Sequence, residues 1–532
     1  MFAINIMKKE KEMEKRESLR KWVVLVLGAL IYAVLYAFCS QIDETGTISW
    51  STAAVRFAVA LPVALAALWL LMRHALPRIE MKPDEKPGKP FCTWGAFLFL
   101  FCCYVPLFLF EFPGSFTYDT EYQVRQGITD PFSTYQPLLH TLLIHFTLLF
   151  ANLFGSMERC AALYSIIQMT LVSFCFSQVC ASISRSVSRR AARLSMLFFG
   201  LYPAHMAFAC NSTKDVLFSA FLVVFMALCF EELFYGLTGK RRILQIICGV
   251  LVCLLRNNMV YAMIVWLVIL MLARKTYRHV ALCAGLSIVL ALGANEGLKA
   301  ATQAEPGILA EMFSVPIQQL ARARLNAPER MTPEELELID AVFPNELYKE
   351  YMPSNSDPIK GKTPGTILKK RLPEFLKTWL SVGVRCPGIY LEAFLNLALP
   401  SLYPYREYKV DAQYIEVEGD VGYTRCFGLP PFERPRRFAA IREWLRENIF
   451  MTGADDVPVV RLLFNTGFIY WLLLLFVLYD MYCGRWKRVL LCMLPVLLWG
   501  TYVLGPVMQG RYLYPFICML PLFVFRRREH AA

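Results

Sequence analysis

Two pairs of charged residues stand at the borders of apolar segments. Asp119 and Glu121 follow one apolar run after a Pro-Gly pair, and Lys214 and Asp215 open another in "NSTKDVLFS". A carboxylate within hydrogen-bond reach of a hydroxyl can accept its proton, and a nearby cation can neutralise an anion. In an extended segment, residues two apart point the same way, so Asp119 and Glu121 are expected to face one side.

Two arginines stand in turns between apolar segments. Arg256 interrupts "LLRNN", and Arg511 precedes Tyr512 in "MQGRYLYP". The guanidinium group is a planar fork that matches the oxygens of a phosphate group. If the four segments share one side of a membrane, their side chains can form one anion-binding site.

Each of these residues also has a purely structural interpretation. Asp119 fits a loop-end solubilising group or a helix N-cap, and Asp215 fits an N-cap because "NSTKD" is rich in capping residues. Lys214 can extend along apolar surface to reach water. Arg256 and Arg511 can anchor their turns at the membrane interface. Sequence leaves these alternatives open.

Composition places these residues in a membrane protein. The 532 residues are 57% hydrophobic, with a mean hydropathy of +0.44, which is more apolar surface than a soluble chain of this length can bury. The net charge of +13 is clustered in short loops, as in cytoplasmic loops, and does not indicate nucleic-acid binding. The 17 cysteines lie mostly in apolar runs and are interpreted as small buried side chains.

The fold class predicted is an all-α polytopic membrane protein with about twelve transmembrane helices, interfacial helices and an irregular extracytoplasmic cap. The stretch 243–273 is flanked by basic clusters on both sides, so it is predicted to form a hairpin that turns at Asn257. Segments 137–154 and 376–399 are interpreted as interfacial, although crossing stays an alternative. The other spans are expected near 22–40, 54–72, 93–112, 159–183, 191–209, 214–235, 279–298, 457–482, 487–505 and 510–525.

The basic loops assign a side to each segment. They place both termini in the cytoplasm of a multi-pass protein of the cell membrane, and the charged residues above on the outer face. The predicted organisation is a basic N-terminus (1–21), an extra transmembrane hairpin with its inner loop (22–92), a transmembrane core (93–299) whose first outer loop is 113–158, an extracytoplasmic cap with an interfacial helix (300–456), and C-terminal helices with a basic tail (457–532).

The order of these features resembles the GT-C superfamily of membrane glycosyltransferases, which includes protein O-mannosyltransferases and aminoarabinose transferases. There the first outer loop carries an acid just past its span, followed by interfacial helices that often begin with a His-Pro-Pro-Leu motif. The matching "QPLLH" at 136–140 lacks the leading His-Pro. The ending "GRYLYP" resembles the Arg-Tyr-Leu-x-Pro endings of such enzymes, and the segment 313–340 resembles an uncharacterised bacterial branch. The resemblance covers about residues 90–275 and the last span.

The resemblance implies an inverting transfer of a sugar from a polyprenyl-phosphate-linked donor to an acceptor on the outer face. Asp119 would be the general base, and Asp215 would orient the acceptor. A divalent metal, Mg or Mn, on these two acids stays open. Arg511 is the first candidate for the donor phosphate, with Arg256 and Lys214 behind it.

Further binding candidates are Glu121, His140, Gln319 and Tyr512. His140 and His145 are five residues apart and are better explained by packing than by a shared metal, and Gln319 also fits a polar helix face. The expected partners are the polyprenyl-phosphate sugar lipid, membrane lipids and an extracytoplasmic acceptor that is a glycan, lipid or protein.

Two other function classes compete with the transferase. A flippase or transporter of a lipid-linked saccharide would also use about twelve spans, but its binding site would lie near the bilayer midplane, often between internal repeats. No repeat is visible in the sequence. A non-catalytic scaffold whose outer loops bind partners in the cell envelope is the third class.

Overall fold

The computed structural model describes residues 2–82, 84, 91–116, 118–150, 153, 157–273, 275–404, 438–441 and 465–527. The described chain is helical apart from one pair of two-residue strands and isolated bridges, so the all-α prediction is confirmed. Seven described helices are long and apolar enough to cross a membrane, or eight if one bent pair counts as a span. The count of twelve crossings stays a prediction.

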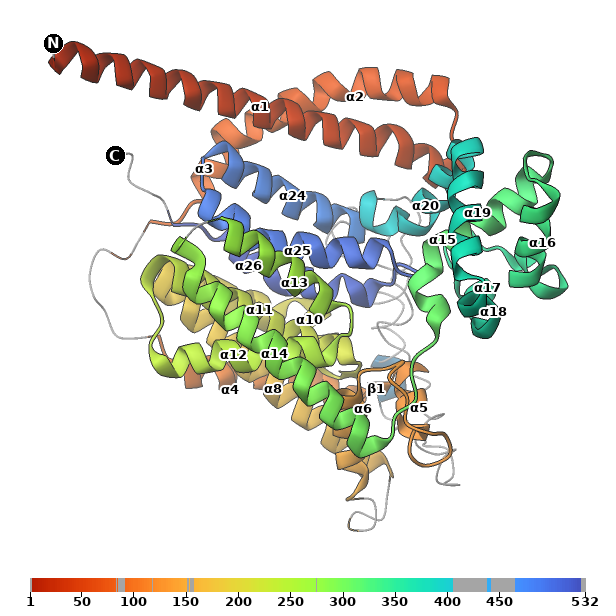
Figure 1. Ribbon diagram of the computed structural model, residues 1–532. Coiled ribbons are helices and arrows are strands. Elements are labelled where there is room, and N and C mark those ends of the chain that lie inside the picture. The colour runs from red at the N-terminus through yellow and green to blue at the C-terminus, as the bar shows by residue number, and fades with distance from the viewer. Residues whose placement is uncertain are drawn as a thin grey trace.

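The first helices form a hairpin. Helix α1 (Phe2–Thr45) turns back into α2 (Trp50–Leu70), which continues through a π-helical turn (Leu71–Ala75) into α3 (Leu76–Ile79). Only 11% of the most apolar window of α2 is buried, so most of its side chains face outward. Figure 1 shows this hairpin along one edge of the molecule, above α24 (Thr466–Tyr482) and α20 (Pro387–Leu402). The extra N-terminal hairpin therefore lies at the edge of the bundle, and a few of its side chains, among them Val24, Ala29 and Leu68, join the main apolar core.

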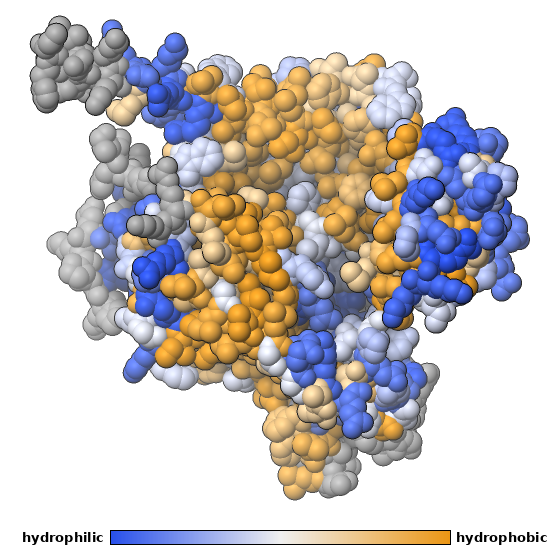
Figure 2. Space-filling model, viewed as in Figure 1, coloured by the Kyte–Doolittle hydropathy of each residue, from blue (hydrophilic) through white to orange (hydrophobic). Residues whose placement is uncertain are grey.

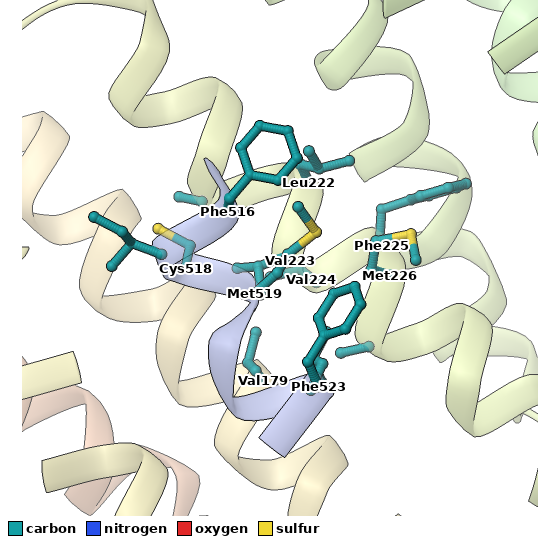
Figure 3. Close-up of a cluster of buried hydrophobic side chains, with 14 of the residues drawn as sticks. Val179, Leu222, Val223, Val224, Phe225, Met226, Phe516, Cys518, Met519 and Phe523 are labelled. Atoms are coloured by element: carbon teal, nitrogen blue, oxygen red, sulfur yellow. The ribbon is translucent and has the colours of Figure 1, made fainter. Parts of the chain in front are cut away.

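A central bundle carries the main apolar core. Helix α26 packs against α11, and α11 packs against α8 and α12. Figure 3 shows Val179, Phe225 and Met519 among the side chains that meet there. The elements of the bundle are α4 (Thr93–Phe110), β1 (Ser115–Phe116), α5 (Tyr118–Arg125), α6 (Leu138–Leu148), α8 (Met157–Ser186), α9 (Arg189–Leu201), α10 (Pro203–Ala209), β2 (Asn211–Ser212), α11 (Lys214–Tyr235), α12 (Gly239–Leu255), α13 (Met259–Leu272), α14 (Arg278–Thr302), α24 (Thr466–Tyr482), α25 (Trp486–Val503) and α26 (Tyr514–Val524).

The predicted hairpin in 243–273 is present. Helix α12 ends at Leu255 and α13 begins at Met259, and the turn between them contacts the first outer loop through the Asn257 amide, which donates to the Thr134 carbonyl at 3.1 Å. Thr134 also contacts the backbone that follows α14, because the Thr134 N–H donates to the Glu305 carbonyl at 2.9 Å. The turn, the first outer loop and the end of α14 thus share one end of the bundle, which we call the outer end after the prediction from the basic loops.

Two predicted segments take a different form. The expected span 191–209 is broken into α9 and α10 at Tyr202, because Pro203 lacks an N–H and holds the preceding residue in an extended conformation (φ −72°, ψ 122°). Segment 376–399 falls on two helices, α19 (Leu372–Arg385) and α20, that meet at 107°, so it does not form one straight helix. Helix α6 has 11 residues, too few to cross a bilayer, which agrees with an interfacial position. Residues 457–464 of an expected span lie outside the described residues.

A separate cap follows α14. It has its own apolar cluster, which includes Ile317, Leu338 and Phe375, and Figure 2 shows its hydrophilic outer surface beside the apolar body. Its helix α16 (Pro333–Val342) begins with a capping box, in which Thr332 and Glu335 are partners. The elements of the cap are α15 (Ser314–Asn326), α16 (Pro333–Val342), α17 (Asp357–Lys360), α18 (Gly365–Lys370), α19 (Leu372–Arg385) and α20 (Pro387–Leu402), with 3₁₀ turns at Leu309–Phe313, Pro328–Arg330 and Pro344–Glu350; two further 3₁₀ turns lie in the bundle at Lys275–Tyr277 and Gly510–Tyr512.

Candidate functional site

The two pairs of charged residues meet because β1 and β2 pair in parallel. Ser115 aligns with Asn211 and Phe116 with Ser212, and the Thr120 hydroxyl lies 3.0 Å from the Ser212 hydroxyl. Asp119 and Asp215 follow their strands by three residues each. This short pairing places the two carboxylates at neighbouring helix starts.

Gly114 is required where the loop enters this pairing. Its φ is +120°, a region that residues with a Cβ rarely adopt. An added Cβ would clash with the Ser165 hydroxyl and lie 2.9 Å from the Cys210 carbonyl oxygen. Cys210 accepts a hydrogen bond from the Ser115 N–H at 3.0 Å. The Pro-Gly pair that ends the apolar run therefore allows close approach of two backbones.

Asp119 forms the centre of an ion-pair cluster. One carboxylate oxygen lies 2.6 Å from Arg511 Nη1 and 2.7 Å from Lys214 Nζ. The other accepts a hydrogen bond from the Gln136 amide at 3.0 Å, and Gln136 also contacts Lys214 through its carbonyl oxygen. The side chain of Asp119 is 7% exposed, which excludes the role of a loop-end solubilising group.

Asp215 connects the other arginine to this cluster. It is fully buried and forms an ion pair with Arg256, while its second oxygen lies 3.6 Å from Arg511 Nε. Its alternative role as the N-cap of α11 is wrong, because the cap residue is Thr213. Arg511 therefore contacts both carboxylates.

Arg256 packs against two tyrosine rings. Its guanidinium carbon lies 4.4 Å from the ring centroid of Tyr502 and 4.6 Å from that of Tyr512. Such contacts are cation–π interactions, and they hold the plane of the guanidinium group. Its Nε donates to the Asn258 side chain at 3.2 Å. Arg256 is 8% exposed, which does not fit a simple interfacial anchor.

The core of the bundle explains why residues so distant in sequence meet. Helices α11 and α26 both begin at the outer end and run side by side (Figures 1 and 3). Lys214 is the first residue of α11, and Arg511 lies three residues before α26. The apolar packing of the two helices therefore fixes the distance between their charged starts.

Glu121 does not join the cluster, contrary to the prediction. Residues 118–125 form helix α5, where residues two apart are separated by about 200° around the axis. Asp119 points inward, while Glu121 is half-buried. The prediction assumed an extended segment, in which the two side chains would point the same way. In a helix they point in different directions.

His140 lies in a buried network beside the cluster. Its two ring nitrogens contact the Gln123 side chain at 2.9 Å and the Tyr164 hydroxyl at 2.7 Å. Burial lowers the pKa of His140 to about 3, aided by the charge of Lys214 and opposed by that of Asp119, so the ring is neutral. His145 instead contacts the Gln123 backbone carbonyl at 3.0 Å, and the two histidines have separate partners, as the packing interpretation predicts.

Gln319 lies in the cap and not in the cluster. Its amide donates to the Tyr390 carbonyl at 3.1 Å and accepts from the Trp379 indole at 2.8 Å. Both ends of its side chain hold the fold of the cap together. The structure gives it no place among the charged residues.

Three contributors were absent from the predicted site residues. Gln136 bridges Asp119 and Lys214, and it is the first residue of the "QPLLH" segment, which was a usable signal. Gln509 accepts from Arg511 Nε at 2.7 Å, and Tyr502 supports Arg256. Gln509 lies in a turn and Tyr502 in an apolar run, and neither stretch of sequence indicates a site residue.

The charges of the cluster do not cancel. Among the described residues, three cations, Lys214, Arg256 and Arg511, face two carboxylates, Asp119 and Asp215, which leaves one positive charge if all are ionised. Burial by itself raises the pKa of Asp119, but the charges of Arg511 and Lys214 outweigh it and hold that pKa well below its usual range. The cluster can therefore accept one anion.

The donor set does not fit a divalent metal. Both carboxylates are already paired with cations, and no third acidic or histidine ligand joins them in the described part of the structure. Within the described part of the chain, no group of three or more His, Cys, Asp or Glu side chains is arranged to hold a metal ion. No step below depends on a metal.

Comparison with known families assigns the chain to a group defined by sequence. A family model described as a family of unknown function (DUF6020) matches residues 120–532. The chain belongs to this family. Lys214, Asp215, Arg256 and Arg511 lie within the matched residues, and Asp119 immediately precedes them. No curated protein and no solved structure gives a significant match.

Proposed function

We propose that the chain is a membrane glycosyltransferase that moves a sugar from a polyprenyl-phosphate-linked donor to an acceptor on the outer face. The observation that carries this proposal is the buried cluster of Asp119 and Asp215 with Lys214, Arg256 and Arg511. It combines a carboxylate able to take a proton with an excess of cations able to hold a phosphate group.

The charge of the donor matches that of the cluster. A sugar joined to a polyprenyl chain through one phosphate is a phosphodiester with one negative charge, which balances the single positive excess. When the glycosidic bond breaks, the departing polyprenyl phosphate gains negative charge. Arg511 and Lys214 would stabilise this charge more strongly in a buried site than in water.

Asp119 is a weak base while Arg511 and Lys214 surround it, because both cations lower its pKa. Donor phosphate would compete with Asp119 for these cations. As they turn toward the phosphate, the pKa of Asp119 rises and the carboxylate becomes able to accept the proton of an acceptor hydroxyl. Asp215 would meanwhile hold Arg256 and orient Arg511.

The position of the site suits a lipid donor. The charged helix starts lie at the outer end of a bundle of apolar helices, so a phosphate can lie in the cluster while its chain extends along the helices. Figure 2 shows a hollow between the apolar body and the cap, with hydrophilic side chains inside it. An acceptor of the cell envelope would approach from this side.

Binding of polyprenyl phosphate tests the proposal in detergent-solubilised protein. The lipid should raise the unfolding temperature, since a ligand at 100 times its Kd stabilises the folded state by about 2.7 kcal/mol. Arg511→Lys should lose most of this stabilisation, because a point charge replaces a planar fork. Lys299→Met is the matched control, since Lys299 lies in the last turn of α14 and pairs only with Glu296 among the described residues, at 2.6 Å.

The proposal fails if polyprenyl phosphate stabilises Arg511→Lys and Arg511→Ala as much as the parent. Proteoliposomes distinguish the function classes. Movement of labelled lipid-linked sugar across the bilayer with no new glycosidic bond would overturn the transferase in favour of a flippase.

A further inference from the structure

A second set of arginines surrounds a pocket at the opposite, inner end of the bundle. The pocket encloses about 240 Å³ and lies where α8, α11 and α26 meet the turn between α24 and α25. Among the described residues, four arginines line it and no carboxylate does. These are Arg485, Arg488, Arg526 and Arg527.

We propose that this pocket binds a phosphate group, presented by the headgroup of an anionic phospholipid. The site is independent of the proposed transferase, because it shares no residue with the outer cluster.

Two acids behind the pocket hold three of the arginines in place. Asp480 is fully buried and contacts Arg526 Nε at 2.8 Å and Arg488 Nε at 3.3 Å. Glu80 lies 2.7 Å from Arg485 Nη2. Among the described residues, four arginines against these two acids leave two positive charges, which is more than enough to neutralise the single negative charge of a phosphodiester headgroup.

One guanidinium nitrogen remains without a hydrogen bond. Arg485 Nη1 is buried and has no hydrogen-bond partner among the described residues, and Asp480 Oδ1 lies 3.8 Å from it. The Arg485 side chain is only 10% exposed. A buried donor left unpaired costs free energy, and a phosphate oxygen in the pocket would satisfy it.

Two further acids of the described chain near the pocket, Glu231 and Glu232, are paired with other arginines. Glu231 pairs with Arg185 at 2.8 Å and with Arg241 at 2.6 Å. Glu232 pairs with Arg242 at 2.9 Å. Each acid is thus neutralised by its own arginine, and the pocket keeps its positive charge.

The remaining walls favour a lipid over a free anion. They include Phe230, Phe234, Leu522 and Phe525, which lie at the ends of apolar helices. An apolar wall beside arginines suits a glycerophosphate with its first acyl carbons, and basic pockets between membrane helices on the cytoplasmic side bind anionic headgroups. The basic loops predict that this end faces the cytoplasm.

The test compares lipids and variants on the purified full chain. In nanodiscs, phosphatidylglycerol should raise the unfolding temperature above its value in phosphatidylcholine. Arg485→Lys with Arg527→Gln should lower the apparent affinity for phosphatidylglycerol by about tenfold or more. Arg485→Lys keeps a charge for Glu80, and Arg527 pairs with the Tyr235 hydroxyl at 2.9 Å and with no carboxylate among the described residues, so the fold should persist. Lys487→Gln is the matched control, since Lys487 is exposed on the same turn and does not line the pocket.

A comparison with inorganic phosphate distinguishes the two possible sources of the bound phosphate group, which are a lipid headgroup and a soluble anion. Stabilisation by phosphatidylglycerol that inorganic phosphate does not reproduce supports the lipid site. Equal stabilisation by inorganic phosphate, lost in the double variant, supports the phosphate site but assigns it to a soluble anion. The proposal is overturned if the double variant and Lys487→Gln respond to phosphatidylglycerol alike, or if phosphatidylcholine stabilises as well.

Discussion

Replacement of Asp119 by asparagine should destabilise the protein as well as abolish transfer. The asparagine keeps the shape and one acceptor, but it leaves Arg511 and Lys214 buried with only Asp215 to balance them and Arg256. Removal of one partner of a buried ion pair costs about 3–5 kcal/mol. An exposed capping residue would lose almost nothing, because asparagine caps as well as aspartate.

The loss should be visible in thermal unfolding of the solubilised protein. At about 2 °C per kcal/mol, the lower end for chains of 150–250 residues, a loss of about 3 kcal/mol lowers the unfolding temperature by about 6 °C. Glu121→Gln is the matched control, because it removes the same charge two residues away on α5 at a half-buried position. It should change stability by less than about 0.5 kcal/mol.

The difference in stability between the parent and Asp119→Asn should depend on pH. Since the folded-state pKa of Asp119 is lowered, its ion pairs contribute stability above the unfolded-state pKa of about 3.9. This contribution is lost as the pH falls through the lowered folded-state value. The difference in stability between the parent and Asp119→Asn should therefore be constant from neutral pH to about pH 5 and shrink below pH 4.

A second substitution tests the pairing directly. Adding Lys214→Met to Asp119→Asn removes one of the two unpaired cations. The loss of unfolding free energy in the double variant should therefore be smaller than the sum of the losses in the two single variants. Equal unfolding temperatures for Asp119→Asn and Glu121→Gln, or additive losses in the double variant, would refute the buried cluster. Transfer activity falling about 100-fold with unchanged stability would instead show that the carboxylate acts as a base outside these ion pairs.

Three further outcomes are expected. Gly114→Ala should lower the free energy of unfolding by about 1–3 kcal/mol and reduce transfer, because the φ of Gly114 is +120° and an added Cβ would meet a hydroxyl and a carbonyl. Thermal unfolding measures this loss, with Gly365→Ala as the control, because an added Cβ at Gly365 would meet open space. A cysteine at Asn257, where the hairpin turns, should react with a membrane-impermeant thiol reagent added outside cells, and labelling only after lysis would contradict the predicted sidedness. Arg256→Lys should lower the unfolding temperature by about 2–4 °C, since lysine keeps the charge but loses the planar contact with two tyrosine rings; no change would mean that this contact contributes nothing measurable.

Sequence alone determined the helical class and most borders of the long apolar helices, for local reasons. Apolar runs of the required length predict helices, and α11 begins at Lys214 and ends at Tyr235 as the pattern 214–235 indicated. The break at Arg256–Asn258 followed from basic clusters on both flanks. Sequence also selected Asp119, Lys214, Asp215, Arg256 and Arg511 as one group, because charged residues beside apolar runs are confined to the ends of the helices.

Only the tertiary structure decided how these residues are paired. Sequence could not show that Asp119 faces inward and Glu121 does not, because that depends on whether residues 118–125 are helical or extended. Nor could it show that Arg511 contacts both carboxylates, since this distance is set by the packing of α26 against α11, which are separated by almost 300 residues. Ion pairing depends on atomic distances between helix ends, and those distances are a property of the packed core and of no single segment.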